Sequence, residues 1–561
     1  MIYPQKGQTR PWLGSGLGDV ILDEEWRERT IKKEALDYHE AEPRGKIKVV
    51  PTKPHSTSHE LSLAYSPGVA YPCLEIEKRP EDAYRYTSKG NLVAVISNGT
   101  AVLGLGNIGA LASKPVMEGK GLLLKTFADI DVFDIQVDTE DPEEFINTVC
   151  NIAPTFGGIN LEDIKAPECF EIERRISEST NIPVMHDDQH GTAIISGAAL
   201  LNSVELQEKN ISEIKVVVAG AGASAIACAS HYVALGVKRE NILMCDSQGI
   251  MTKKRLDLGE LNEYKAQFAV DMADGNLADA LVGADVFLGL SKGGLVTGDM
   301  VAKMAPKPII FALANPTPEI MPSEVKAVRE DAIIATGRSD FPNQVNTVLG
   351  FPYIFRGALD VRARDITQGM KMAATKALAK LAKEPVPDYI AHAYSGESMQ
   401  YGPDYIIPKP FDRRVLIWEA ADVAEAAVHE GVAAVSPEDF DKQAYRESLE
   451  ARLGMSYSVM RGVFNQVKGR RKRIVFPEGD HEKVIRAAAQ CIEQQICEPI
   501  LLGNVDNIKQ KMADLNIEFD CEITNPRYDS RRIGNYDLEL LENRSRKGMT
   551  IIDAQRLLKS R

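Results

Sequence analysis

Four acidic residues stand in two adjacent pairs, and their chemistry is that of a hard metal site. The pairs are Glu162–Asp163 and Asp187–Asp188. Carboxylate oxygens from two segments suit Mg²⁺ or Mn²⁺, which prefer oxygen ligands. A buried cluster of this kind is costly unless a cation balances it. Taken alone, acid pairs are more often solvated surface features, so the context must decide.

The second pair lies in a polar run, His186-Asp-Asp-Gln-His-Gly-Thr192, directly before an apolar helix. Ligands at the start of a helix stand on a rigid element, which favours a metal site. His186 and His190 raise the alternative of a softer Zn²⁺ or Fe²⁺ site. We prefer the interpretation that both histidines are structural or support the carboxylates.

Two further residues have side chains that can move protons. Lys120 lies between glycines, and a lysine beside a metal and other cations can have a lowered pKa and act as a base. Tyr65 precedes a Pro–Gly turn, where its phenol could donate a proton. The alternatives are a solvated surface lysine and a boundary tyrosine that packs its ring.

Two loops match the GxGxx(G/A) pattern of a dinucleotide site, and one such match is weak evidence. Their small residues are Gly104, Gly106 and Gly109 in the first loop and Gly220, Gly222 and Ala225 in the second. The site requires a strand, a tight turn and a helix whose N-terminus faces the pyrophosphate. Pro115, Gly119 and Gly121 leave little room for a helix after the first loop. We expect the cofactor at the second loop, although an ordinary βα turn is the alternative, and a turn near the substrate at the first.

Residues after the next strand bear on the choice of cofactor. Asp246 ends that strand, where an acid can bond the adenine ribose, and it suits NAD because it would repel a 2′-phosphate. Lys253, Lys254 and Arg255 could hold such a phosphate, or could form a solvated basic loop. These residues leave NAD and NADP open.

Two asparagines complete the candidate site. Asn315 ends a strand, and ligands bind at the carboxyl ends of strands in open parallel sheets. Asn346 lies in a loop further along the chain. Either amide could bond a substrate carboxylate or stabilise a turn.

The composition is that of an ordinary globular protein. The chain has 561 residues, of which 44% are apolar and 26% charged, with a net charge of −14. The length predicts roughly three to four domains. The charge argues against nucleic-acid or membrane-surface binding. Eight scattered cysteines, without a signal peptide or a stretch long enough to span a bilayer, favour a reducing cytoplasm.

Short apolar strands alternate with helices from Ile214 onward, which is typical of a parallel sheet with helices on both faces. The predicted strands there are 216–219, 242–245, 286–290, 308–313 and 332–335. Earlier runs at 92–97 and 130–137 also resemble strands, and a long helix is expected at about 191–209. The pattern resets near Ser436, where a polar helix, the basic run 468–473 and a second α/β unit follow.

Several runs together resemble the bacterial malic enzymes. They are 61–72, 102–138, 160–163, 184–201, 216–225, 311–318 and 339–360. The segment from about Met455 is similar to the start of a phosphotransacetylase domain, through 473–479 and 499–503. The whole resembles the hybrid malic enzymes, in which a malic enzyme is fused to a phosphotransacetylase-like regulatory domain.

The resemblance implies an α/β fold in four parts. Residues 1–195 would form the malic-enzyme N-terminal domain for substrate and metal. Residues 196–435 would form a Rossmann-type doubly wound parallel sheet for NAD(P), with C-terminal helices. A linker helix at 436–456 and a partial phosphotransacetylase-like domain at 457–561 would complete the chain.

The resemblance also implies roles for individual residues. Tyr65 is the general acid and Lys120 the general base, with Asp187 beside them in the catalytic group. The expected ligands of Mg²⁺ or Mn²⁺ are Glu162, Asp163 and Asp188. Asn315 and Asn346 contact malate, and Asn315 also borders the cofactor. The expected cofactor contacts are Gly220, Gly222, Ala223, Ser224 and Ala225 at the diphosphate and Asp246 near the ribose.

The implied activity is oxidative decarboxylation of (S)-malate to pyruvate and CO₂, with reduction of NADP, or of NAD as the alternative, by an enzyme that forms a homodimer or a higher homo-oligomer. Decarboxylation of oxaloacetate is also expected. Other functions consistent with the residues are a metal-dependent oxidoreductase for tartrate or isocitrate, a non-catalytic nucleotide sensor and an acetyl transferase.

The sequence departs from the family in three places. The family often has Asn-Asn where this chain has Asn346-Thr347, and larger relatives have an arginine near the position of Ala101, which would bind a carboxylate. The phosphotransacetylase-like segment has about a third of the length that such a domain needs. We therefore expect acetyl transfer to be absent and acetyl-CoA control to be lost or weakened.

Overall fold

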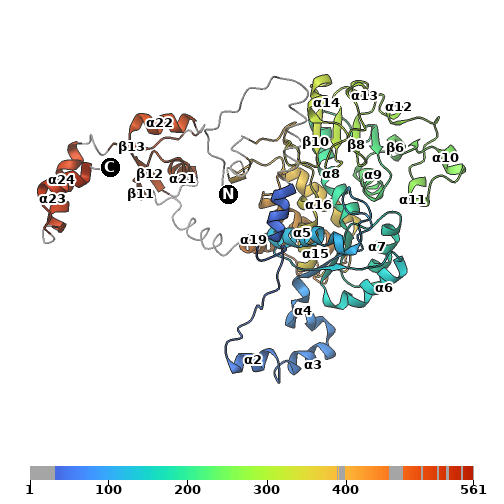
Figure 1. The fold of residues 1–561 in the computed structure, drawn as a ribbon, viewed down its shortest axis with the longest axis horizontal. Coiled ribbons are helices and arrows are strands. Elements are labelled where there is room, and N and C mark those ends of the chain that lie inside the picture. The colour runs from blue at the N-terminus through green and yellow to red at the C-terminus, as the bar shows by residue number, and fades with distance from the viewer. Residues whose placement is uncertain are drawn as a thin grey trace. The chain divides into compact units, whose positions relative to one another are not determined.

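The computed structural model describes residues 32–387, 389–390, 394, 399–453, 472–493, 497–514, 517, 519–525, 530–544 and 548–559 (Figure 1). The chain divides into two compact units, Met1–Leu449 and Glu450–Arg561. Most of the predicted basic run 468–473 lies outside the described residues. The four predicted domain boundaries stay a prediction.

The first sheet of unit Met1–Leu449 is parallel, in the order β2-β1-β3-β4. Its strands are β1 (Leu92–Ser97), β2 (Asp131–Gln136), β3 (Gly158–Leu161) and β4 (Val184–His186). Every residue of β1 and β3 is buried, because central parallel strands are covered by helices on both faces. The connecting helices are α5 (Ala110–Ala128), α6 (Pro142–Ile152) and α7 (Glu168–Ser179), and α8 (Asp187–Leu206) follows β4 directly.

Helix α5 corrects one expectation. We predicted little room for a helix after Gly109, but α5 is 19 residues long and contains Pro115. Its buried face packs on the sheet, and a Cβ at Gly121 would lie 3.3 Å from Val132 Cγ1, so glycine permits close contact with β2. Packing of this kind outweighs intrinsic helix propensity.

The second sheet has the order β10-β9-β8-β5-β6-β7, and only β7 runs antiparallel to its neighbour. Its strands are β5 (Val216–Ala219), β6 (Ile242–Asp246), β7 (Gly249–Ile250), β8 (Val286–Gly289), β9 (Ile309–Ala312) and β10 (Ile333–Thr336). Helix α9 (Ala223–Leu235) follows β5, and α10 (Lys253–Asp257), α11 (Glu263–Ala266), α12 (Leu277–Ala280), α13 (Gly298–Ala302) and α14 (Pro322–Val328) lie between later strands. The predicted α/β class with parallel sheets is confirmed.

Helices α15 (Phe351–Asp360), α16 (Gln368–Leu381), α18 (Arg414–His429) and α19 (Lys442–Arg452) follow the second sheet. Helix α18 packs on both α15 and α16, and α16 packs on α8. Arg356 of α15 is buried and donates to Asp360 and to Asn91 Oδ1, at 2.6 Å. These contacts join the helical layer to the first sheet.

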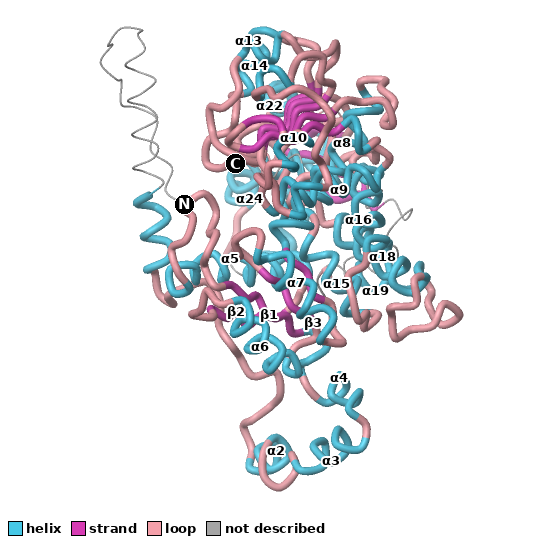
Figure 2. The backbone as a smooth tube through the Cα atoms, turned by 90° about the vertical axis from the view of Figure 1, so that its right-hand side faces the viewer, coloured by secondary structure: helices cyan, strands magenta, loops and turns pink. Residues whose placement is uncertain are grey.

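The segment Ser58–Lys78, called the N-terminal arm here, differs from the rest of its unit. It contains α2 (Ser58–Ala64) and α3 (Ala70–Lys78), and neither helix has a buried residue. Both views show α2 and α3 standing away from α5 and the first sheet (Figures 1 and 2). The arm exposes large hydrophobic side chains, including Leu61, Leu63, Tyr65, Tyr71 and Leu74. The short elements η1 (Pro80–Asp82), α4 (Ala83–Tyr86) and η2 (Ser88–Asn91) lead from the arm to β1.

Unit Glu450–Arg561 contains a parallel sheet in the order β11-β12-β13. Its strands are β11 (Lys472–Phe476), β12 (Cys497–Leu502) and β13 (Glu522–Thr524), and its helices are α21 (Glu482–Glu493), α22 (Val505–Asp514), α23 (Ser530–Arg544) and α24 (Ile551–Lys559). Its small core contains Ile485, Leu501 and Ile508. In the described part of the chain, no helix is long and apolar enough to cross a membrane.

Candidate active site

Strand register brings the two acid pairs together. β3 and β4 are parallel neighbours, and Leu161 pairs with His186 at their last positions. Glu162 and Asp187 are therefore the next residues at the same carboxyl edge, where ligands bind in parallel sheets. Three of the acids are buried, namely Glu162, Asp163 and Asp187. Buried carboxylates require a nearby positive charge to offset the loss of hydration.

Three of the acids form a group suited to a divalent cation. One carboxylate oxygen from each of Glu162, Asp163 and Asp188 lies within 4.8 Å of the others. Asp163 Oδ2 is buried and has no hydrogen-bond partner among the described residues. Burial, followed by the Asp188 charge, raises the pKa of Asp163 to about 7, and burial raises the pKa of Glu162. An all-oxygen donor set with an orphaned buried acceptor fits Mg²⁺ or Mn²⁺.

Lys120 reaches this group from α5. Its Nζ lies 2.9 Å from Glu162 Oε1, donates to Asp187 Oδ2 and lies 4.4 Å from the centroid of the Phe351 ring. Burial lowers the pKa of Lys120, but the Asp187 and Glu162 carboxylates outweigh it and raise the pKa. The predicted lowering requires the positive charge of a bound metal beside Lys120, and it stays a prediction.

Asp187 is held tightly beside Lys120. A Cβ at Gly191, one helical turn later, would lie 2.0 Å from Asp187 Oδ1, so only glycine fits there. Thr347 also borders this space. The hydroxyl of Thr347 therefore lies beside Asp187 at the position where the family often has an asparagine.

Glu173 of α7 is a residue that the sequence reasoning missed. Its carboxylate accepts hydrogen bonds from His186 N at 2.9 Å, Gln189 Nε2 at 3.1 Å and His190 Nε2 at 3.0 Å. Burial raises the pKa of Glu173, but His190 and Lys371 outweigh it and hold the pKa at about 2. The carboxylate thus fixes the start of α8, which carries Asp187 and Asp188. An available signal was its place beside Ile172 and Ile176 on the apolar face of α7.

The two histidines have different surroundings. His190 contacts Glu173 and Lys371, and His186 Nε2 lies 3.8 Å from Asp188 Oδ2. Both imidazole nitrogens of His186 are buried without a partner among the described residues. The group of three close ligand atoms contains neither histidine.

Tyr65 lies apart from this cluster. It caps the C-terminal end of α2 in the N-terminal arm, and 77% of its surface is exposed. Within one chain, the structure does not bring the predicted acid to the predicted base.

The second glycine loop has the geometry that a dinucleotide requires. Gly220 has φ of +125°, and a Cβ there would lie 2.5 Å from the carbonyl oxygen of Leu290. A Cβ at Gly222 would meet nothing within 4 Å, so a ligand can approach the backbone. α9 begins at Ala223, and Ala225 is buried. Ser224 Oγ donates to the carbonyl oxygen of Asp188 at 2.7 Å, which joins this loop to the first turn of α8.

Asp246 does not present a free carboxylate at the end of β6. Arg255 donates to both of its oxygens, each at 2.9 Å, and Lys265 Nζ lies 3.7 Å away. Burial raises the pKa of Asp246, but Arg255 outweighs it and lowers the pKa. Lys253 and Lys254 pair with Asp271 and Asp274. All three basic residues of the predicted loop therefore have acidic partners.

The two asparagines have different settings. Asn346 Oδ1 accepts from Val348 N at 3.0 Å and caps the short helix η5 (Thr347–Leu349). Asn315 is exposed beyond β9, and its backbone oxygen lies 3.0 Å from a Cβ built at Gly104. The first glycine loop also contacts the acids, since Leu103 N donates to Asp163 Oδ1 at 3.3 Å. This loop therefore lies between Asn315 and the acidic cluster.

A carboxylate cluster on one parallel sheet and a dinucleotide-type loop joined to it from a second sheet are typical of a dinucleotide-linked oxidoreductase. Comparison with known families agrees. The family "Malic enzyme, N-terminal domain" matches residues 44–177, and "Malic enzyme, NAD binding domain" matches residues 189–390. "Phosphate acetyl/butaryl transferase" matches residues 458–561.

The chain is 56% identical to the NADP-dependent malic enzyme of Halomonas elongata over 402 residues, which cover 72% of this chain and 94% of that protein. It is 53% identical to the NADP-dependent malic enzyme of Salmonella typhimurium over 533 residues, which cover 94% of this chain and 70% of that one. An NAD-dependent malic enzyme of Rhizobium meliloti is 52% identical, over 89% of this chain and 65% of that one.

Among solved structures, the malic enzyme from Pyrococcus horikoshii is 43% identical with a TM-score of 0.69, over 78% of this chain and 98% of that one. The chain belongs to the malic enzyme family and carries a phosphotransacetylase-type segment at its C-terminal side. The predicted resemblance to hybrid malic enzymes is therefore confirmed.

Proposed function

We propose that this chain oxidatively decarboxylates (S)-malate to pyruvate and CO₂ with Mg²⁺ or Mn²⁺ and NADP. The observation that carries the proposal is the meeting of Lys120 with Glu162 and Asp187, beside the three-acid group, at one sheet edge. The bond from Ser224 to Asp188 supports it, because it holds the cofactor loop next to that edge.

In this proposal, Glu162, Asp163 and Asp188 hold the metal. The bound metal and NADP supply a Lewis acid and a hydride acceptor. Lys120 accepts the proton of the C2 hydroxyl, while Asp187 orients its amine. After CO₂ leaves, Tyr65 delivers a proton to C3. The same groups support decarboxylation of oxaloacetate, which needs no hydride transfer. Asn315 and Asn346 are proposed to contact the substrate.

The cofactor preference is proposed to be for NADP. A lone carboxylate at Asp246 would repel a 2′-phosphate, but the Arg255 guanidinium compensates its charge through two hydrogen bonds. The names of the relatives from Halomonas and Salmonella agree with this preference. An Arg255→Met variant should shift the NADP/NAD ratio of kcat/KM toward NAD by about 10-fold or more, as loss of a charge-assisted contact predicts. An unchanged ratio would assign cofactor choice to other residues.

A homodimer or higher homo-oligomer is proposed from the N-terminal arm. The arm exposes Leu61, Leu63 and Tyr65 without burying any residue of α2 or α3. Exposed apolar patches of this kind mark interfaces. We infer that the arm packs on a second copy and brings Tyr65 to that copy's Lys120. Sedimentation of a Leu63→Asp variant should show weakened association, whereas Glu77→Gln, a change on an exposed polar position of the same arm, should leave it intact.

The first experiment is to follow nicotinamide reduction with L-malate and Mn²⁺, with NADP or NAD, and with or without EDTA. We expect EDTA to abolish pyruvate formation, and we expect Asp188→Asn to lose metal-dependent turnover. Turnover by Asp188→Asn without metal would contradict the ligand assignment. A panel with tartrate and isocitrate tests the alternative substrates, and activity on either of them but not on malate would replace the proposal.

Two further proposals concern control and location. Whether acetyl-CoA controls malate turnover stays a prediction about the phosphotransacetylase-type segment at residues 458–561. Titration of acetyl-CoA into the assay tests this expectation. A cytoplasmic location is proposed from the eight free cysteines, which a reducing compartment maintains.

A further inference from the structure

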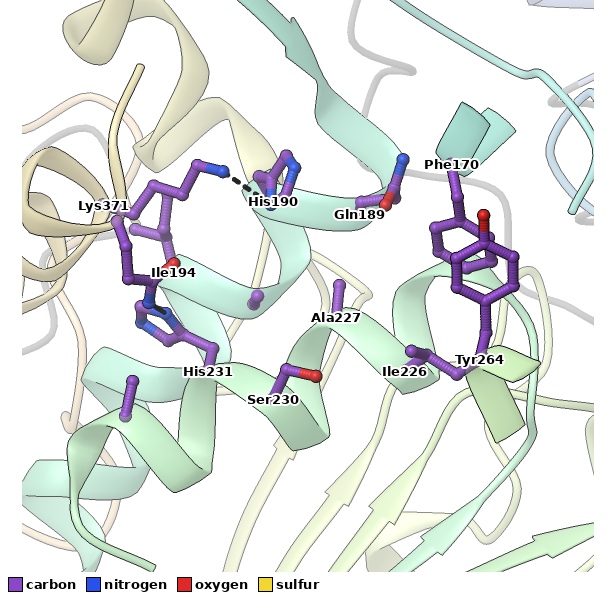
Figure 3. Close-up of a pocket in the computed structure, with 13 residues that line it drawn as sticks. Phe170, Gln189, His190, Ile194, Ile226, Ala227, Ser230, His231, Tyr264 and Lys371 are labelled. Atoms are coloured by element: carbon purple, nitrogen blue, oxygen red, sulfur yellow. Dashed lines mark hydrogen bonds between the residues drawn. The ribbon is translucent and has the colours of Figure 1, made fainter. Parts of the chain in front are cut away.

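A cavity of about 360 Å³ lies beside the active-site helix α8 and is used by no step of the proposed reaction. Residues of α7, α8, α9, α11 and α16 line it (Figure 3). None of the acidic cluster lines it, although Gln189 and His190 follow the cluster directly on α8. The cavity is therefore a second space, separated from the metal group by the first turn of that helix.

One end of the cavity carries a cation that can bind an anion. Lys371 Nζ donates to His190 Nδ1 at 3.2 Å, and His190 Nε2 donates to Glu173 at 3.0 Å. His190 therefore acts as a neutral ring with one acceptor and one donor, both in use. An ammonium has three donor protons. Since Lys371 lines the cavity, its remaining donors are available to a group that enters. Burial lowers the pKa of Lys371, while the charges of the Glu173 and Asp365 carboxylates act against this lowering.

A second histidine at this end does not compete for that anion. Gln368 Nε2 donates to His231 Nδ1 at 3.1 Å, and His231 Nε2 lies 2.8 Å from Thr375 Oγ1. Both ring nitrogens are thus occupied by neutral partners. Burial and the Lys371 charge lower the pKa of His231 to about 4, so the ring is uncharged near neutral pH. The anion-binding end therefore rests on Lys371.

The rest of the cavity is mostly apolar, with Gln189 and Ser230 as polar lining residues, and it ends in an aromatic pair (Figure 3). Ala227 of α9 lies between the two ends, and Ile194 of α8 lies on the Lys371 side (Figure 3). Phe170 and Tyr264 stack with ring centroids 4.2 Å apart and planes inclined by 28°. In the close-up, this pair and Lys371 lie at opposite ends of the lining (Figure 3). A ligand that uses both ends must be elongated, with a charged group at one end and an apolar body toward the other.

We propose that this cavity binds a small amphipathic carboxylate, with its carboxylate on Lys371 and its apolar body extended toward the Phe170–Tyr264 pair. The site would be an effector site, since it adjoins the helix that begins with Asp187 and Asp188. A carboxylate there would bond Lys371 in competition with His190.

Calorimetry on the full chain, without malate, metal or cofactor, tests the proposal separately from the proposed function. Phenylbutanoate serves as the probe, phenylbutanamide as its uncharged isostere and acetate as an anion without an apolar body. We expect phenylbutanoate to bind about 10-fold or more tighter than either comparison compound, as one charge-assisted hydrogen bond predicts. Equal binding of the amide or of acetate, or no binding of phenylbutanoate, would overturn the proposal.

Two variants locate the binding. Lys371→Met should weaken phenylbutanoate binding about 10-fold or more, while Lys376→Met, an exposed position on the same helix, should leave it unchanged. Ala227→Phe keeps Lys371 but fills the apolar middle, and it should abolish binding. Thermal unfolding of each variant checks that it is folded. Unchanged binding in folded Lys371→Met or Ala227→Phe would place the probe elsewhere and sink the assignment.

Discussion

Lys120 and Tyr65, the two residues proposed to move protons, are held in opposite ways. The Lys120 side chain is 12% exposed and contacts Glu162, Asp187 and the Phe351 ring. Tyr65 is 77% exposed and belongs to an arm whose two helices bury nothing. One chain therefore holds the proposed proton acceptor through several contacts. The proposed proton donor stands on an exposed arm and needs contact with another surface to take a fixed position.

Complementation between two inactive variants tests most directly whether Tyr65 acts on the Lys120 of a second copy. Lys120→Met and Tyr65→Phe should each lower malate turnover by about 10²–10⁴-fold, the usual effect of losing a general base or acid. If Tyr65 acts on a second copy, a mixed dimer of the two variants contains one intact site. Co-expression of both chains should then restore up to about a quarter of wild-type activity, because half of randomly formed dimers are mixed. Turnover no higher than that of either variant would place Tyr65 on its own chain's Lys120.

The pH dependence of the free energy of unfolding tests the proposal that the acidic cluster binds a cation. Burial and Asp188 raise the pKa of Asp163 from 3.8 to about 7. The folded state therefore favours the protonated carboxyl, and this contribution, present below about pH 4, is lost as pH rises through about 7. Without metal, the free energy of unfolding should fall over this window by up to about 4 kcal/mol. Thermal unfolding with EDTA should show the fall and Mn²⁺ should remove it; equal curves would contradict a metal at Asp163.

A change at Glu173 tests whether the position of Asp187 and Asp188 depends on the contacts that hold the start of α8. Glu173→Gln removes the charge that holds His186 N, Gln189 and His190, so Asp188 should lose its fixed position. We expect Mn²⁺ affinity to weaken by about 10–100-fold, as for other groups that orient metal ligands. Titration of Mn²⁺ measures this without turnover. Glu178→Gln, an exposed change on the same helix, is the matched control, and equal effects in both variants would refute a specific role.

Two strands were predicted correctly from the sequence, because short continuous apolar runs are typical of buried parallel strands. The prediction for 92–97 coincides with β1, and that for 216–219 coincides with β5. The predicted helix at 191–209 starts too late, since α8 begins at Asp187. The first turn of this helix contains acidic residues, so the apolar pattern that predicts a helix begins only after it.

The site was less accessible from the sequence, for physical reasons. The two acid pairs were found by their type, but their meeting depends on the register of Leu161 with His186, which no local pattern encodes. Glu173 lies between the two pairs in the chain, but by composition it is an ordinary helix acid. The position of Tyr65 depends on how the N-terminal arm packs. Local sequence does not determine this packing, because it depends on contacts with residues distant in the chain.

The hydrogen bond from Ser224 to the carbonyl oxygen of Asp188 joins the loop proposed to bind the cofactor to a residue proposed to bind the metal. By thermodynamic linkage, if NADP strengthens the hold on Mn²⁺ by some factor, Mn²⁺ strengthens the hold on NADP by the same factor. Redesign of the glycine loop for another coenzyme would therefore also retune the metal requirement, so any such engineering has two affinities to optimise together.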